Sequence, residues 1–149
     1  MRQAIFNLLL TAIQGMAKFK LANGVSTVYA YGVGSPDGYP YATITAESMD
    51  SEVLDNYRDL RLYNYLITVV GEKFGEPGGY TQERAWESMR ETEDALCSLW
   101  DGNNTFSGSG LGIIRTMPTN SKYGYTDGGS RIVLELRVQF QVAVSITTL

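Results

Sequence analysis

The sequence has no histidine, and its 149 residues include only one cysteine, Cys97. Without histidine, a single chain cannot build a Ser-His-Asp triad or a Cys-His pair, and structural zinc sites lack their usual set of ligands. One cysteine also excludes a disulfide framework within the chain. We therefore predict that the protein is not an enzyme and that it holds no cofactor and no metal.

Basic charge and long apolar runs are also scarce. The chain has 12 Lys and Arg residues against 16 Asp and Glu, which gives a net charge of -4 and an isoelectric point near 4.8. Nucleic-acid binders neutralise phosphates with a basic surface, so DNA could pass this protein but would not be gripped by it. No stretch approaches the roughly 20 apolar residues of a membrane-spanning helix. The length suits one hydrophobic core and is too short for two ordinary domains.

The clearest pattern that is present lies near the C-terminus, where apolar and more polar residues alternate from 131 to 147. The apolar side consists of Ile132, Leu134, Leu136, Val138, Phe140, Val142, Val144 and Ile146. A period of two predicts a strand with one buried face. At about 3.3 Å per residue this strand would reach roughly 50 Å, which exceeds the roughly 38 Å diameter of a compact domain of this length. We expect it to coil, to bend at a bulge or to overhang its domain, and an overhanging strand offers unpaired backbone groups for self-assembly.

Two other segments repeat apolar residues at helical spacing. The first stripe is Ile5, Leu8, Leu9, Ala12, Ile13 and Met16, and the second is Ala85, Met89, Thr92, Leu96 and Leu99. The N-terminal segment also has features of a short signal peptide, but its periodicity favours an amphipathic helix that packs on a sheet. Thr81 is placed to cap the second helix, which we expect to run to Trp100.

The remaining apolar runs predict strands at residues 25–33, 41–46, 62–70 and 113–117. Residues 62–70 are apolar on both sides, which indicates a central strand covered on both faces. The set that faces the helices is either Tyr63, Ile67 and Val69 or Leu62, Leu66 and Val70. Residues 101–112 and 120–130 have the composition of loops. The chain, residues 1–149, is thus predicted to be one α+β domain of order αβββαββ, with an antiparallel or mixed sheet packed against two helices.

Residues 47–61 form the longest charged connection of the chain. Its charges alternate in sign, which is typical of a solvated or intersubunit surface, and their spacing does not match a calcium loop. We weigh this surface role above an acid and base pair for catalysis. Together with the outer face of the last strand, it supplies the candidate subunit or partner contacts Asp50, Glu52, Asp55, Arg58, Asp59, Arg61, Arg131, Glu135 and Arg137.

The order of these elements resembles that of the tail terminator, or tail completion, proteins of long-tailed bacteriophages. The resemblance rests on the first helix, on Tyr39-Pro40-Tyr41-Ala42-Thr43-Ile44, on the charged segment, on Arg61-Leu62-Tyr63-Asn64-Tyr65-Leu66-Ile67-Thr68-Val69-Val70, on the second helix and on the long final strand. It covers nearly the whole chain and depends on element order and pattern, because that family has no short diagnostic motif.

The resemblance implies a structural virion protein without catalytic activity. Such a protein forms a ring, expected to be a hexamer, at the head-proximal end of the tail tube, where it stops tube growth and presents a docking surface. Its partners would be other copies of itself, the tail tube protein and the head connector or neck proteins, with DNA passing through unbound and no membrane involved. Its location would be the tail and neck of a virion assembled in the bacterial cytoplasm.

Two alternatives remain open at this stage. A head-tail connector or another neck protein would share the size, the acidity and the lack of catalytic motifs. A small oligomeric α+β enzyme or ligand-binding domain belongs to a different class, and it would form discrete dimers around a ligand-sized internal pocket where a ring protein would surround a central hole.

Overall fold

A computed structural model describes residues 2–32, 34–77, 79–101, 106 and 109–145 of the chain. The elements are α1 (Arg2–Gln14), the short helix η1 (Ala17–Phe19), β1 (Val28–Ala30), β2 (Tyr41–Val53), β3 (Arg58–Val70), α2 (Gln82–Asp101), β4 (Ile113–Thr126), η2 (Asp127–Gly129) and β5 (Arg131–Ser145). The predicted α+β fold of order αβββαββ is therefore confirmed.

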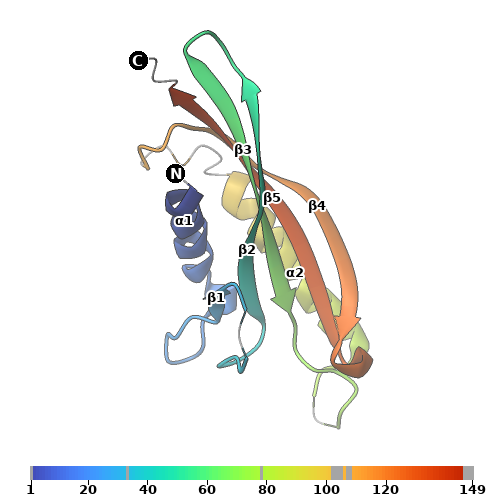
Figure 1. Ribbon diagram of the computed structural model, residues 1–149. Coiled ribbons are helices and arrows are strands. Elements are labelled where there is room, and N and C mark those ends of the chain that lie inside the picture. Colours follow the sequence, from blue (N-terminus) through green and yellow to red (C-terminus); the bar gives the residue numbers. More distant parts are fainter. Residues whose placement is uncertain (1, 33, 78, 102–105, 107–108, 146–149) are drawn as a thin grey trace.

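The five strands form one mixed sheet in the order β1-β2-β3-β5-β4. β1 is parallel to β2, and each of the other neighbouring pairs is antiparallel. Both helices pack on the same face of this sheet (Figure 1), so the domain has two layers. The expectation that residues 62–70 are covered on both faces is wrong, because Leu62 and Leu66 point to the open face and are only half-buried there. β3 is central because strands flank both of its edges.

The core lies between the helices and the alternating residues of the two central strands. The sheet contributes the buried residues Tyr63, Tyr65, Ile67 and Val69 from β3 and Leu134, Leu136, Val138, Phe140 and Val142 from β5. Of the two alternatives for β3, the set with Tyr63 is the one that faces the helices. Val144 is only half-buried, and β5 reaches beyond the helices at this end (Figure 1). Ile146, the last member of the predicted β5 face, lies outside the described residues.

The amphipathic stripe of α1 is anchored to the sheet, as predicted. Ile5, Leu9 and Ile13 are fully buried, and Phe6 packs against the ring of Tyr65 at 6.2 Å between centroids. The Tyr65 hydroxyl donates a hydrogen bond of 3.1 Å to the carbonyl oxygen of Arg2. A carbonyl in the first turn of the helix is thus tied to the central strand.

α2 begins where the sequence indicates. The Thr81 hydroxyl accepts the backbone N–H of Arg84 at 3.2 Å, which is the predicted cap. The buried face of the helix is Ala85, Met89, Thr92, Leu96 and Trp100, whereas Leu99 is half-buried. Within the described residues, no helix has the length and apolar character needed to cross a membrane.

Three strands are longer than predicted. Residues 47–61 are not a loop, because β2 continues to Val53 and β3 starts at Arg58, with a bulge between Ala46 and Ser48. β4 runs to Thr126 where a loop was expected from residue 120. The added segments of β2 and β3 are mostly polar, and in the added part of β4 only Tyr123 and Tyr125 mark the side that packs on Trp86. These segments are strands because the backbones of β3 and β5 pair with them.

β1 is shorter than the predicted strand 25–33. It ends at Ala30 because Tyr31 adopts a positive φ of 66°, a left-handed conformation that no strand continues through. Of the predicted strand, Val33 lies outside the described residues.

The predicted overhang exists, but three strands share it. β5 is paired with β3 along the whole of β3, up to Ser145 opposite Arg58. The hairpin of β2 and β3, with the end of β5 beside it, continues beyond the start of α1 and forms the narrow end of an elongated molecule (Figure 1). The self-assembly argument therefore moves from β5 alone to this hairpin.

The buried face of β5 can be tested with Val138→Asp. Val138 is 0% exposed, and an unpaired charge at such a position costs several kcal/mol against a total stability of about 5 to 15 kcal/mol. We expect this variant to lose its cooperative thermal transition. Gln139→Asp, one residue along on the open face, is the matched control and should melt cooperatively. A soluble Val138→Asp protein that melts like the wild type would show that the face is assigned wrongly.

The contact between Tyr65 and α1 predicts a stability loss at alkaline pH. Burial raises the pKa of Tyr65 from 10.0 to about 12. The unfolded chain can ionise this tyrosine at about pH 10 while the native state cannot, so its contribution is complete below pH 10 and is lost as the pH rises to about 12. Urea unfolding at pH 9 and 11 should show the advantage of the wild type over Tyr65→Phe shrinking by about 1 kcal/mol. An advantage that does not change with pH would contradict the burial of this hydroxyl.

Candidate functional site

The tip of the β2–β3 hairpin is an ordered turn. Asp55 accepts hydrogen bonds from the backbone N–H of Tyr57 at 2.9 Å and from two nitrogens of the Arg58 guanidinium at 2.9 and 2.7 Å. The backbone N–H of Leu54 donates to the carbonyl of Arg58 at 3.1 Å. The hydrogen bond from Arg58 is the main reason why the pKa of Asp55 is lowered. Two predicted contact residues, Asp55 and Arg58, thus fix the turn itself.

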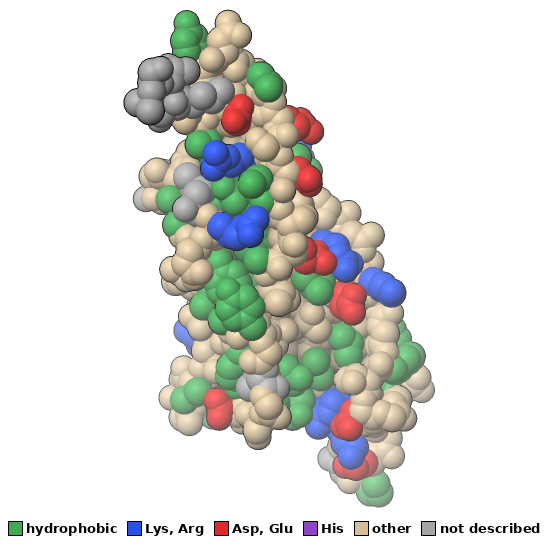
Figure 2. All heavy atoms as spheres, viewed as in Figure 1, with side chains coloured by type: hydrophobic (Ala, Val, Ile, Leu, Met, Phe, Trp, Pro, Cys, Tyr) green, Lys and Arg blue, Asp and Glu red, His purple; other side chains and the backbone are tan. Residues whose placement is uncertain are grey.

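This turn displays large apolar side chains to solvent. Val53 is 81% exposed and Tyr57 is 78% exposed, and Met49 and Leu54 nearby are exposed as well. Hydrophobic side chains accordingly appear at the narrow end of the molecule in Figure 2. Single exposed apolar residues are ordinary on protein surfaces, whereas a group of them on one short hairpin marks an interaction site.

The other predicted charges of the segment lie along the same hairpin. Asp50 and Glu52 are exposed on β2, and Asp59 and Arg61 are half-buried on β3. The structure therefore brings all six predicted residues of this segment onto one projecting element. Sequence reasoning missed the apolar members, because Val53 and Tyr57 interrupt a charged run and do not form a periodic pattern.

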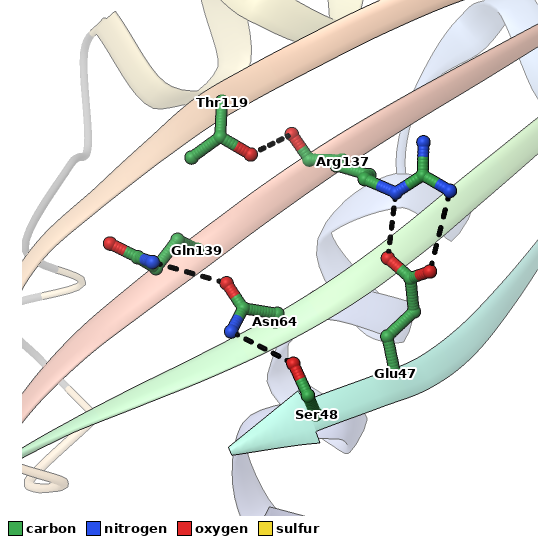
Figure 3. A network of polar contacts seen from close by, with 6 residues as sticks. All are labelled: Glu47, Ser48, Asn64, Thr119, Arg137 and Gln139. Carbon is green, nitrogen blue, oxygen red and sulfur yellow. Dashed lines mark hydrogen bonds and ion pairs between the residues drawn. The ribbon is translucent and has the colours of Figure 1, made fainter. Parts of the chain in front are cut away.

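A second polar group lies on the open face of the sheet (Figure 3). Arg137 donates hydrogen bonds of 3.0 and 3.4 Å to the two carboxylate oxygens of Glu47. Gln139 donates to Asn64, and Asn64 donates to Ser48, each at 3.1 Å. These contacts link β5 and β3 to the bulged part of β2. Arg137 was predicted as a contact residue, and its partner Glu47 was missed because it is distant in sequence.

The remaining predicted residues are not part of the hairpin. Glu135 lies on the open face of β5, on the same side as Arg137. Arg131 lies at the opposite end of the sheet, where its guanidinium stacks 3.6 Å from the ring centroid of Tyr39 and donates to the carbonyl of Gly71 at 3.0 Å. Its Nε also pairs with Asp127 at 3.3 Å. The structure gives Arg131 a role inside the subunit, and its predicted role in contacts between subunits stays a prediction.

The far edge of the sheet has a small hollow beside the beginning of β4. It has a volume of about 240 Å³ and is lined by Trp100, Asp101, Arg115, Thr116, Met117 and Pro118. Two of these residues also carry a buried polar atom, Nε1 of Trp100 and Oγ1 of Thr116, that has no hydrogen-bond partner within the described part of the chain. Buried polar atoms are normally paired, so these two need an explanation.

The described residues hold no group of three His, Cys, Asp or Glu side chains that could bind a metal ion. Cys97 is half-buried on α2, and burial raises the pKa of its thiol. A raised thiol pKa reduces the fraction of the nucleophilic thiolate at neutral pH.

Comparison with known proteins identifies the fold. The structure is similar to a chain in the structure titled "Virion of native gene transfer agent (GTA) particle", with a TM-score of 0.59 and 12% sequence identity over 91% of this chain and 92% of that chain. No model of a protein family matches the sequence. The search of curated proteins found no match either. At this identity the likeness establishes a shared fold over nearly the full length of both chains.

If the apolar residues of the hairpin tip serve recognition, the subunit should not need them to fold. Val53 and Tyr57 are mostly exposed, and surface substitutions usually change stability by no more than about 0.5 kcal/mol. We therefore expect Val53→Ser and Tyr57→Ser to leave the urea unfolding midpoint nearly unchanged. Destabilisation by more than about 2 kcal/mol would mean that the tip packs within the subunit, because that size is typical of core truncations.

Proposed function

We propose that this chain is a structural virion protein that forms a ring at the head-proximal end of a phage tail tube, where it ends tube growth and presents the docking surface for the head connector. The observation that carries the proposal is the fold shared with a chain of the gene transfer agent virion over 91% of this chain. Its partners are then copies of itself, the tail tube protein and the neck proteins.

The surfaces of the subunit support this role. A ring of identical subunits needs two different, complementary flanks, so that each copy uses one flank to bind the other flank of the next copy. Here β1 and the uncovered part of β2 form one flank of the sheet, and β4 forms the other. A two-fold symmetric dimer would instead bind through the same patch on both copies and would not need two complementary flanks.

The composition supports a structural rather than a catalytic protein. The chain has no histidine, and the described residues hold no group of three His, Cys, Asp or Glu side chains that could bind a metal ion. The net charge of -4 also suits a protein that surrounds a DNA channel, because a negatively charged surface does not bind the phosphates of the passing DNA.

Deleting the gene from the genome that encodes this chain tests the proposal. A terminator that is missing leaves tube growth unchecked, so electron microscopy should show tails of abnormal and variable length and heads without tails. Restoring the wild-type gene is the control. Tails of normal length that fail to join heads would instead indicate a neck protein, and normal tailed particles would refute a structural role at this position.

A further inference from the structure

We infer that neighbouring copies of this chain bind each other edge to edge, with the distal part of β2 from one copy lying antiparallel against the beginning of β4 from the next. This inference rests on the proposed ring, and it names the contact that closes it. The two edges, the position of their charges and the hollow beside β4 each point to it.

Both edges are unpaired at the same end of the sheet. β1 covers β2 only as far as Ile44, so residues 45–53 of β2 have no strand beside their outer edge in the described part of the chain. The outer edge of β4 likewise has no neighbouring strand there. Unpaired edges bind further strands unless something protects them.

The two edges also lie at the same level of the sheet, and their strands run in opposite directions. The residue pairs that connect β2 to β3, β3 to β5 and β5 to β4 place Ser51 level with Ile113 and Ser48 level with Met117. β2, β3, β5 and β4 alternate in direction, so β2 runs antiparallel to β4. Placing two copies side by side therefore sets the open part of β2 against residues 113–117 in an antiparallel arrangement, in which directly opposite residues can exchange backbone hydrogen bonds.

The charges of the two edges are complementary. Asp50 pairs with Leu62, Leu62 with Gln141, and Gln141 with Arg115, so Asp50 and Arg115 end one row of residues on the open face. Both end residues are exposed. When copies stand side by side, Asp50 of one lies opposite Arg115 of the next. Opposite charges directly across a pair of strands stabilise the pairing.

Apolar groups complete the contact. On the helix side, Met49 ends the row that begins with Thr116, so an exposed Met49 comes to the hollow beside β4. Ile114, an exposed residue at the bulge of β4, adds apolar surface.

A disulfide between positions 50 and 115 tests this contact directly, because its formation reports that the two positions are close and does not require a change in the stability of the subunit. In a Cys97→Ser background, Asp50→Cys and Arg115→Cys are combined in one chain. Within a copy these positions lie three strand spacings apart, about 14 Å, and a disulfide requires Cα atoms within about 7 Å. Any bond between them therefore joins two copies.

Mild oxidation of particles carrying this double variant should give a ladder of covalent oligomers on a non-reducing gel. Each single-cysteine variant gives at most dimers. Asp50→Cys with Lys122→Cys, which moves the second cysteine along β4, is the matched control and should give no ladder. The absence of a ladder from particles that contain the double variant would overturn the proposed contact.

A charge exchange gives the second test. Asp50→Arg and Arg115→Asp should each reduce the yield of tailed particles, and the two together should restore it, because the exchanged pair keeps opposite signs. Lys122→Asp should leave the yield unchanged. If the single reversals have no effect, or if the double variant is no better than either, the Asp50 and Arg115 pair is wrong.

These results separate the contact from the proposed function. If rings on tails are seen but the cysteines at positions 50 and 115 do not bond, the ring stands and the contact fails. If the ladder forms in concentrated purified protein while particles assemble normally without the gene, the contact stands and the role at the tail end fails.

Discussion

The pairing of β3 with β5 is the constraint on which the rest of the structure depends. Thirteen residue pairs in continuous register join these strands from Arg58 and Ser145 to Val70 and Val133. Because side chains alternate with a period of two, this register places the aromatic residues Tyr63, Tyr65 and Phe140 on one face, where the helices pack. A shift of either strand by one residue would move that strand's members of the set to the open face.

The same register also creates the surfaces that we assign to assembly. β3 is as long as β2 and continues past the helices, so β2 follows it outward and ends in a hairpin with no helix beneath it. On the other side, β5 carries β4 to the opposite edge and sets Arg115 level with Asp50. The core and the two flanks are therefore consequences of one long strand pair, and a contact at the flanks is coupled to the packing that holds the subunit together.

The sequence predicted an element correctly wherever one face of that element is buried and the other is exposed to solvent. The alternation in β5 and the stripes of the two helices predicted their residues and their buried sides. The outer halves of β2 and β4 could not be found in this way, because residues such as Ser48, Asp50, Thr119 and Lys122 are exposed and have no periodic contrast. Backbone pairing with a distant strand makes them strands, and that cause is invisible to local pattern. For the same reason the charged segment was correctly marked as a surface but wrongly described as a loop.

The protection of the two edges explains why assembly would be limited to one end of the sheet. The lower half of β2 is covered by β1. On β4, Pro118 lacks a backbone N–H and lies next to a bulge, and Lys122 further along is exposed. Proline, bulges and lysine are the features that prevent edges from pairing indiscriminately. Between these features, and beyond the bulges at Ala46/Ser48 and Ile113/Arg115, short regular edges remain open, and residues 48–50 of β2 lie level with residues 115–117 of β4. A sheet that was open along its full edges could grow without limit in several registers, whereas two short matching edges at one end favour a single register and a defined angle between copies, which is what a closed ring needs.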